Sequence, residues 1–329
     1  MLDIVRLDFD PTIALVGLTV RLETLALAGV ILLTLVMAAL GAGRMRSRLV
    51  ASAEGPRPDA ARLRRDDLIL IAFGAVPGAV VGGRLGYGLV HLDYYSGDPS
   101  LLTDPARGGL SLTLAVVLGT VSGLAVALLL AAPIARWLHV ASGPLLIGLG
   151  LGKLAMVLGG TGQGQFSNAS WATEYARPGP WGSLVPADPA LPSQALEGGL
   201  VLFAAALLVL VPFLLRLRLR RWQRIVRPAL APRREWLMLT GFRRFLTALS
   251  LWAVARFAAG FTWRDAQVVG PLRAEQLVLI GVLAGCAAIL LVAGLWQRRR
   301  RRQSTIGAAA DAEAALPEPR FSRGAAPAP

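Results

Sequence analysis

The sequence predicts an all-α polytopic membrane protein with seven transmembrane helices. Of its 329 residues, 55% are hydrophobic and only 16% are charged, whereas a soluble domain carries about 25% charged residues. The mean hydropathy is +0.57, and apolar runs of about 20 residues, the length that crosses a bilayer, recur along the chain. These three observations exclude a soluble enzyme, a disordered chain and a disulfide-stapled secreted module.

Seven apolar runs account for nearly half of the chain. The first begins well inside the sequence and lacks both a basic leading segment and a small-residue cleavage site, so we interpret it as a retained helix. The seven expected spans are 19–41, 68–92, 110–133, 141–159, 194–215, 236–257 and 276–297.

Arginine is concentrated in alternate connections between these spans. The connections after the first and fifth spans are rich in arginine, and Arg298 to Arg302 follow the seventh span. The positive-inside rule therefore predicts an N-terminus outside and a C-terminus in the cytoplasm, as an odd number of spans allows. The net charge of +14 is explained by topology and anionic-lipid contact, and no nucleic-acid-binding motif accompanies it.

Two segments fall outside the expected helices. Residues 160–193 form a long outer loop rich in Gly, Pro and Ser, with Trp171 and Trp181 suited to the headgroup level. We expect residues 1–302 to form one membrane domain, and the Ala/Pro-rich residues 303–329 to form a disordered cytoplasmic tail.

Ionisable side chains inside the spans are the main candidates for a functional site. Arg84 lies in a Gly-Gly-Arg-Leu-Gly-Tyr run, Lys153 follows alternating glycines, and Gln194 and Glu197 share one helix face because they are three residues apart. Such cations would suit a phosphate-bearing headgroup near the outer half of the membrane. The alternative is an internal ion pair, such as Glu197 with Arg84, that only holds helices together.

Histidine and cysteine carry less information. His91 and His139 are about 50 residues apart and make no metal signature, and we interpret both as interfacial polar residues. The single cysteine, Cys286, can form no internal disulfide and is interpreted as a small buried hydrophobe. No metal and no cofactor are expected.

Several short motifs, in order and at matching spacing, resemble those of the prolipoprotein diacylglyceryl transferase family along nearly all of residues 8–297. The resemblance includes the seven spans and the outside N-terminus. The motifs are Phe9-Asp10-Pro11, Gly82 to Tyr87, Gly108 to Ser111, Gly152 to Gly164, Pro192 to Gln194 with Glu197, and Gly241-Phe242-Arg243.

The resemblance implies transfer of the diacylglyceryl group of phosphatidylglycerol to the lipobox cysteine of a prolipoprotein, at the outer half of a bacterial plasma (inner) membrane. It implies catalytic roles for Arg243, Lys153 and Glu197. It also implies substrate binding by Arg84, Gln194, Gly164 and Ser111. The expected partners are phosphatidylglycerol, the prolipoprotein signal peptide and membrane lipids.

The chain departs from the family pattern at several polar positions. The tyrosine of the first span is Thr24, and the histidine two residues after Ser111 is Thr113. The signature arginine is Lys153, which supplies charge without a bidentate fork, its asparagine is Met156, and the histidine before Pro192 is Leu191. Without the histidine at 113, either another group such as Glu197 removes the proton of the thiol, or the thiol is already ionised. The alternative is a non-catalytic relative that binds phospholipid or lipoprotein precursor.

Overall fold

A computed structural model provides the structure, which describes residues 4–15, 17–51, 63–104, 109–177, 188–225 and 241–314. Gly108 and Trp181, which the sequence analysis used, lie outside the described residues. The chain divides into a first unit, Met1–Cys286, and a second unit, Ala287–Pro329.

Seven helices in the described residues are long and apolar enough to cross a membrane, which confirms the predicted number of spans. They are Leu22–Met45, Asp66–Val90, Leu112–Leu129, Ile134–Gly159, Ser193–Leu215, Gly241–Thr262 and Ala274–Trp296. The third ends earlier than expected, because a tight turn with a positive φ at Ala131 interrupts the apolar run that continues to residue 133, and the fourth begins earlier than expected, at Ile134.

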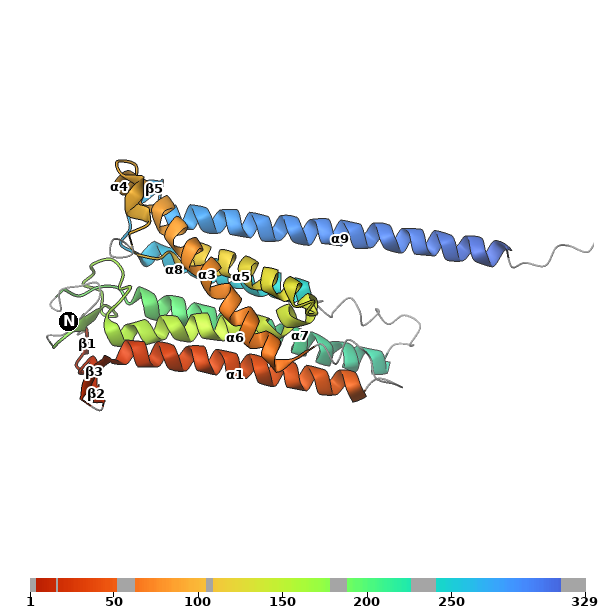
Figure 1. Ribbon diagram of the computed structural model, residues 1–329, viewed down its shortest axis with the longest axis horizontal. Coiled ribbons are helices and arrows are strands. Elements are labelled where there is room, and N and C mark those ends of the chain that lie inside the picture. The colour runs from red at the N-terminus through yellow and green to blue at the C-terminus, as the bar shows by residue number, and fades with distance from the viewer. Residues whose placement is uncertain are drawn as a thin grey trace, which may run out of the picture. The chain divides into compact units, whose positions relative to one another are not determined.

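The helices and strands follow one another along the chain (Figure 1). The helices are α1 (Leu22–Ala51), α3 (Arg65–Val90), α4 (Leu92–Tyr95), η1 (Pro99–Leu102), α5 (Leu112–Leu129), α6 (Ile134–Ala155), η2 (Met156–Gly159), α7 (Ser193–Ile225), α8 (Gly241–Ala259), η5 (Gly260–Thr262) and α9 (Ala274–Ala314). The strands are β1 (Val5–Leu7), β2 (Thr12–Leu15), β3 (Leu18–Arg21), β4 (Thr173–Tyr175), β5 (Gln267–Val269) and β6 (Leu272–Arg273).

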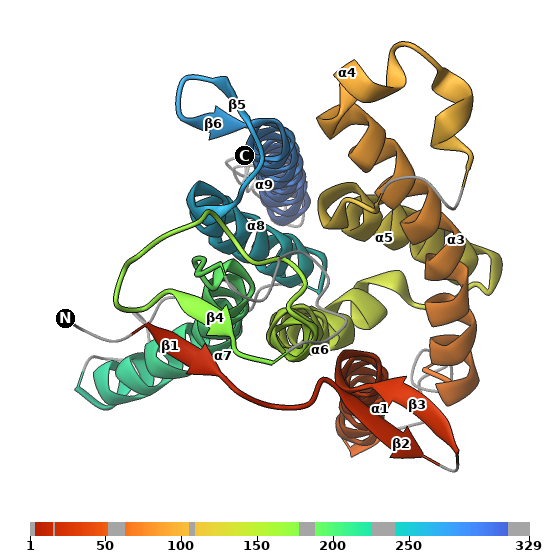
Figure 2. The same cartoon turned by 90° about the vertical axis from the view of Figure 1, so that its left-hand side faces the viewer.

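The six strands make three two-stranded sheets at one end of the first unit, which we call the loop end (Figure 2). β1 pairs with β4 in parallel, and β2–β3 and β5–β6 are antiparallel hairpins. α3 ends at the loop end, as does α6 through η2, and α5, α7 and α9 begin there (Figure 1). Residues from distant parts of the sequence are therefore brought together at this end.

A stripe of glycines allows α3 and α5 to pack along most of their length. The glycines recur every fourth residue on α3, so they lie on one face of the helix. A Cβ on any of them would collide with α5, at Val126, Ser122, the Leu114 carbonyl and Ser111 respectively. The stripe is Gly74, Gly78, Gly82 and Gly86. It fixes the position of the first turn of α5 along α3, where the amide of Ser111 donates to the carbonyl of Gly83 at 2.9 Å.

α6 lies among the remaining helices and contacts α1, α7 and α8 (Figure 2). Far from the loop end, Trp137 and Val140 of α6 pack with Ala38 and Ala42 of α1 in an apolar cluster. Small residues also permit close approach of α6 and α7, because a Cβ on Gly150 would contact Leu202 and the carbonyl of Gly198. This packing fixes α6 against α7 and so sets the relation between Lys153 and Glu197.

The described part of the expected outer loop is ordered by hydrogen bonds. The Tyr175 hydroxyl donates to the carbonyl of Val157 at 2.6 Å, and burial raises the pKa of Tyr175 to about 12. Trp171 is exposed.

At the other end of the chain, α9 continues to Ala314, so helix extends past residue 303, where we expected a disordered tail. Residues 304–314 include five alanines, the residue with the highest helix propensity.

Candidate active site

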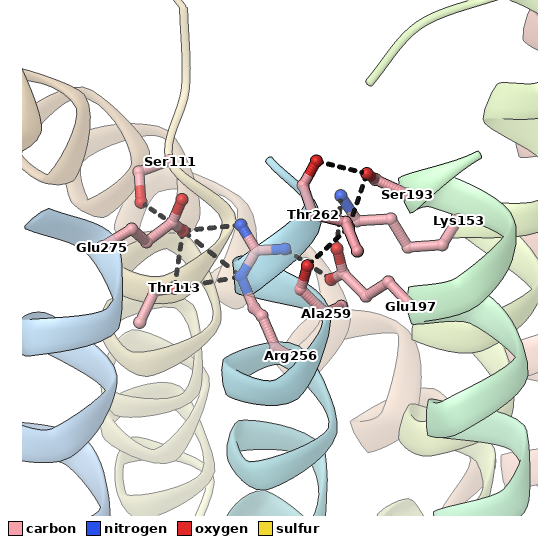
Figure 3. A network of polar contacts seen from close by, with 9 residues as sticks. All are labelled: Ser111, Thr113, Lys153, Ser193, Glu197, Arg256, Ala259, Thr262 and Glu275. Atoms are coloured by element: carbon pink, nitrogen blue, oxygen red, sulfur yellow. Dashed lines mark hydrogen bonds and ion pairs between the residues drawn. The ribbon is translucent and has the colours of Figure 1, made fainter. Parts of the chain in front are cut away.

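Arg256 is the centre of a buried charge network at the loop end (Figure 3). It lies one turn before the end of α8, and only 4% of its surface is exposed. Its guanidinium lies between Glu197 of α7 and Glu275 of α9, and donates to both carboxylates. Its Cζ also lies 4.6 Å from the centre of the Trp263 ring, a cation–π contact.

Glu197 joins Arg256 to the second cation of the network. Its Oε1 accepts from Nη1 of Arg256, and its Oε2 lies 3.2 Å from Nζ of Lys153. Glu197 is 1% exposed, and each of its oxygens has a cationic partner. Burial of a carboxylate at this depth requires such pairing.

Glu275 joins Arg256 to the first turn of α5. Its Oε1 accepts from Nη2 of Arg256 at 2.6 Å, from the Thr113 hydroxyl at 2.7 Å and from the Ser111 hydroxyl at 3.1 Å. The Thr113 hydroxyl in turn accepts from Nε of Arg256 at 3.2 Å. One guanidinium, one ammonium and two carboxylates thus balance one another in charge.

A cavity of about 520 Å³ opens beside the network and is lined by both charged and apolar residues. The charged lining includes Lys153, Arg256 and Glu275, and His91 and Asp265 also contribute. The apolar lining includes Val76 and Val80 of α3, which are both about half exposed. A second cavity of about 350 Å³ shares the wall residues Ala79, Leu112 and Ala115 with the first, and is otherwise lined almost entirely by apolar side chains. Together they form an amphipathic space.

Three of the residues expected at the site lie in the network: Lys153, Glu197 and Ser111. Two others lie beside it. Gln194 is 1% exposed, one turn before Glu197, and does not line the cavity. Gly164 accepts from Nε of Arg264 at 2.7 Å and donates to the carbonyl of Leu191 at 2.8 Å, and a Cβ there would collide with Ser193.

Arg84 and Arg243 are not placed in the network. The guanidinium of Arg84 donates to four backbone carbonyls, including that of Leu102 at 3.0 Å, and so ties them to α3. The carbonyls are those of Leu101, Leu102, Asp104 and Gly109. The expected alternative, an Arg84–Glu197 ion pair, is wrong, because Glu197 pairs with Arg256 and Lys153. Arg243 lies in the first turn of α8, 13 residues and about 20 Å of helix from Arg256.

Sequence reasoning missed Arg256 and Glu275. A signal for Arg256 was present, because it is an arginine near the end of an apolar span, and such residues indicate function by default. The motif Gly241-Phe242-Arg243 drew attention to the opposite end of the same helix. Glu275 directly precedes the expected seventh span, where an acidic residue has the ordinary role of a first-turn helix residue.

The network and cavity are made of residues that the matched family region contains. The model of the prolipoprotein diacylglyceryl transferase family matches residues 29–292, which include every residue of the network. The chain belongs to the prolipoprotein diacylglyceryl transferase family. It is therefore a multi-pass membrane protein of this family, as the sequence predicted.

A named relative agrees with the family match. A phosphatidylglycerol–prolipoprotein diacylglyceryl transferase of Geobacter sulfurreducens is 31% identical over 144 residues, which are 43% of this chain and 53% of that protein. The match thus spans about half the length of this relative.

The departures from the family pattern of prolipoprotein diacylglyceryl transferases fall into two places. Thr113 and Met156 lie at the site, the first in the network and the second on the cavity wall. Thr24 is exposed in α1, and Leu191 contributes its backbone to the loop that holds Gly164. The described residues contain no group of three or more His, Cys, Asp and Glu that could hold a metal.

Proposed function

We propose that this protein transfers the diacylglyceryl group of phosphatidylglycerol to the lipobox cysteine of a prolipoprotein. The observation that carries the proposal is the amphipathic cavity, whose charged lining includes Lys153 and Arg256 and whose apolar lining extends along α3 and α5. A diacyl phospholipid has the same division, with a phosphate next to two hydrocarbon chains.

The two cations are suited to the phosphate. Arg256 offers a planar fork and Lys153 a compact point charge, and a phosphate oxygen accepts charge-assisted hydrogen bonds from both. Glu197 orients them, because one carboxylate contacts both cations. Arg243 is not part of this proposal, since it lies at the far end of α8. Arg84 is not part of it either, because its guanidinium donates to backbone carbonyls between α3 and α5.

The proposed reaction displaces glycerol phosphate from a glycerol carbon. A thiolate attacks that carbon, a C–S bond forms, and the C–O bond to the phosphate breaks with its electron pair on the phosphate oxygen. The departing phosphate gains negative charge, which Arg256 and Lys153 stabilise. Because these side chains are held by Glu197 and Glu275 beforehand, they need little reorganisation at the moment of reaction.

We further propose that the N-terminus is outside, the C-terminus is cytoplasmic, and the membrane is the bacterial plasma membrane. Arginine-rich connections would then lie in the cytoplasm, and the loop end would lie in the outer half of the membrane. A prolipoprotein delivered across the membrane would meet the cavity there.

A second candidate function is binding of phospholipid or precursor without transfer. The balance of charge within the network favours it, because Arg256 already donates to both carboxylates. The two functions differ in one measurable product, the thioether-linked diacylglyceryl group.

The test is complementation combined with transfer by the purified protein. A host is depleted of its own diacylglyceryl transferase, this chain is expressed, and lipidation of a reporter precursor is followed by gel shift. The purified protein is then incubated with phosphatidylglycerol and a lipobox peptide, and the lipidated peptide is detected by mass spectrometry. Lys153→Met tests the site, and Arg243→Met is the matched control.

We expect rescue by the wild-type chain and by Arg243→Met, and a loss of at least tenfold in Lys153→Met. Phosphatidylglycerol binding by the folded protein without any lipidated peptide would establish the binding function in place of transfer. Absence of both binding and transfer would contradict both functions.

A further inference from the structure

We propose that His91 is the group that removes the proton of the acceptor thiol. This inference rests on the proposed transfer reaction. A thiol must lose its proton before it attacks, and the resemblance had left the proton acceptor open because Thr113 replaces a histidine. The sequence analysis assigned His91 to the membrane interface, whereas the structure places it among the residues that line the cavity, together with Arg256 and Lys153.

The hydrogen bonding of His91 determines which ring nitrogen can accept a proton. Nδ1 lies 3.0 Å from the carbonyl oxygen of Tyr87. A carbonyl only accepts, so Nδ1 must carry the hydrogen. In the neutral ring Nε2 then has the free lone pair, which is the form a general base requires.

The ring is also held in a fixed orientation. It stacks on Tyr87, with ring centroids 4.1 Å apart and an interplanar angle of 26°. The backbone amide of His91 donates to the same Tyr87 carbonyl at 3.1 Å, so the residue is fixed at the end of α3 by two hydrogen bonds and one stacking contact. A histidine serving only as an interfacial polar group would need neither tautomer control nor this stacking.

The other proton acceptors on the cavity wall are less suited to this task. Glu275 directs Oε1 at Arg256, Thr113 and Ser111, and so holds the network together. Asp265 is exposed at the edge of the cavity. Glu197, the candidate from the sequence, does not line the cavity, and both of its oxygens are paired.

The ionisable surroundings of His91 contain charges of both signs. The cavity lining carries cations and carboxylates together. Its charges therefore do not oppose the gain of a proton by a neutral imidazole while the thiolate forms. The groups are Tyr87 on its own helix, Asp93, Tyr94 and Tyr95 on α4, Lys153 on α6, Arg256 on α8, Asp265 after η5 and Glu275 on α9.

The proposed step moves the proton of the thiol to His91 before the C–S bond forms. The S–H bond breaks and an N–H bond forms at Nε2 of His91. The thiolate forms the C–S bond, the C–O bond breaks, and the electron pair leaves on glycerol phosphate. The imidazolium then returns its proton to that phosphate or to water. No oxidant, reductant or metal is required.

The test is the pH dependence of transfer by His91→Gln, with His139→Gln as the matched control. Gln keeps an N–H that can donate to Tyr87 but has no titrating nitrogen. With purified protein, phosphatidylglycerol in detergent micelles and a lipobox peptide, we expect the rate of His91→Gln at pH 6.5 to fall by about 10²–10⁴-fold. The gap should narrow towards pH 9, where a thiol with a pKa of about 8.5 ionises without help. Added imidazole should partly restore His91→Ala.

Three outcomes would overturn the inference. They are an unchanged rate in His91→Gln, an equal loss at every pH, and a loss accompanied by weaker phosphatidylglycerol binding in a thermal-shift assay. The last two would assign His91 a structural role. A wild-type protein that binds phosphatidylglycerol but lipidates nothing at any pH would instead contradict the proposed transfer.

Discussion

Removal of Arg256 should destabilise the protein strongly, and simultaneous removal of Glu275 should restore much of the loss. Arg256→Met leaves two buried carboxylates, Glu197 and Glu275, with only Lys153 to balance them. Breaking a buried ion pair from one side costs about 3–5 kcal/mol. Arg256→Met combined with Glu275→Gln removes one charge of each sign, and the Gln oxygen still accepts from Ser111 and Thr113, as Oε1 of Glu275 does.

The assay is thermal unfolding of the purified protein in detergent. A loss of 1 kcal/mol lowers Tm by roughly 2–4 °C in a domain of about 150–250 residues, so Arg256→Met should unfold about 6–20 °C below wild type. We expect the double variant to recover at least half of that difference. Arg243→Met, a half-buried arginine at the other end of α8, is the control and should change stability by less than about 1 kcal/mol.

Transfer activity should not follow stability in this series. Both Arg256 variants lack the guanidinium that we assign to the phosphate, so both should be inactive although the double variant is well folded. Equal Tm values for the single and double variants would refute the charge-balance argument. Recovery of transfer in the double variant would refute the role of Arg256 in phosphate binding.

Three further predictions concern separate parts of the fold. Gly82→Leu should prevent α3 from packing on α5, at a cost of at least about 1–3 kcal/mol, while Gly29→Leu, where a Cβ meets nothing within 4 Å, should be tolerated; expression of folded protein and Tm distinguish them. Lys153→Arg should retain transfer, because charge is kept, while Lys153→Met should lower kcat by about 10²–10³-fold if the ammonium stabilises the leaving phosphate. Stability of the wild type should fall as pH rises above about 10, because tyrosine ionises there in the unfolded chain. Folded Tyr175 does not ionise at that pH, since burial raises its pKa to about 12. A pH series of Tm should show a smaller fall in Tyr175→Phe.

The number and approximate position of the spans follow from the sequence because hydrophobic length is a local property. The ends of the spans do not follow in the same way. Apolar side chains continue through the turn between α5 and α6, where Ala131 adopts a positive φ, so hydropathy alone extends the third span through the turn. The short sheets also escape prediction, because β1 pairs with β4 across more than 160 residues of sequence.

The site was predictable only where its residues lie inside recognisable motifs. Lys153 and Glu197 were found as ionisable residues inside the expected spans and Ser111 from the family resemblance, and the structure brings them together. Arg84 was chosen by the same logic, but its fork is occupied by the carbonyls of a local loop. Backbone carbonyls near an arginine leave no trace in the sequence, so motif reasoning does not separate a loop anchor from a ligand contact.

The substitutions in this chain form a physically consistent set. Thr113 stands where the resemblance implies a histidine, and its hydroxyl donates to Glu275, which neutralises Arg256. The Glu275 carboxylate thus lies against Thr113 and accepts a hydrogen bond from it. If transfer is retained, the proton must go to a group outside this contact, and His91 is the cavity histidine with a nitrogen available. Because Thr113 cannot serve as the base, the pH profile of His91→Gln separates a base at His91 from loss of catalysis.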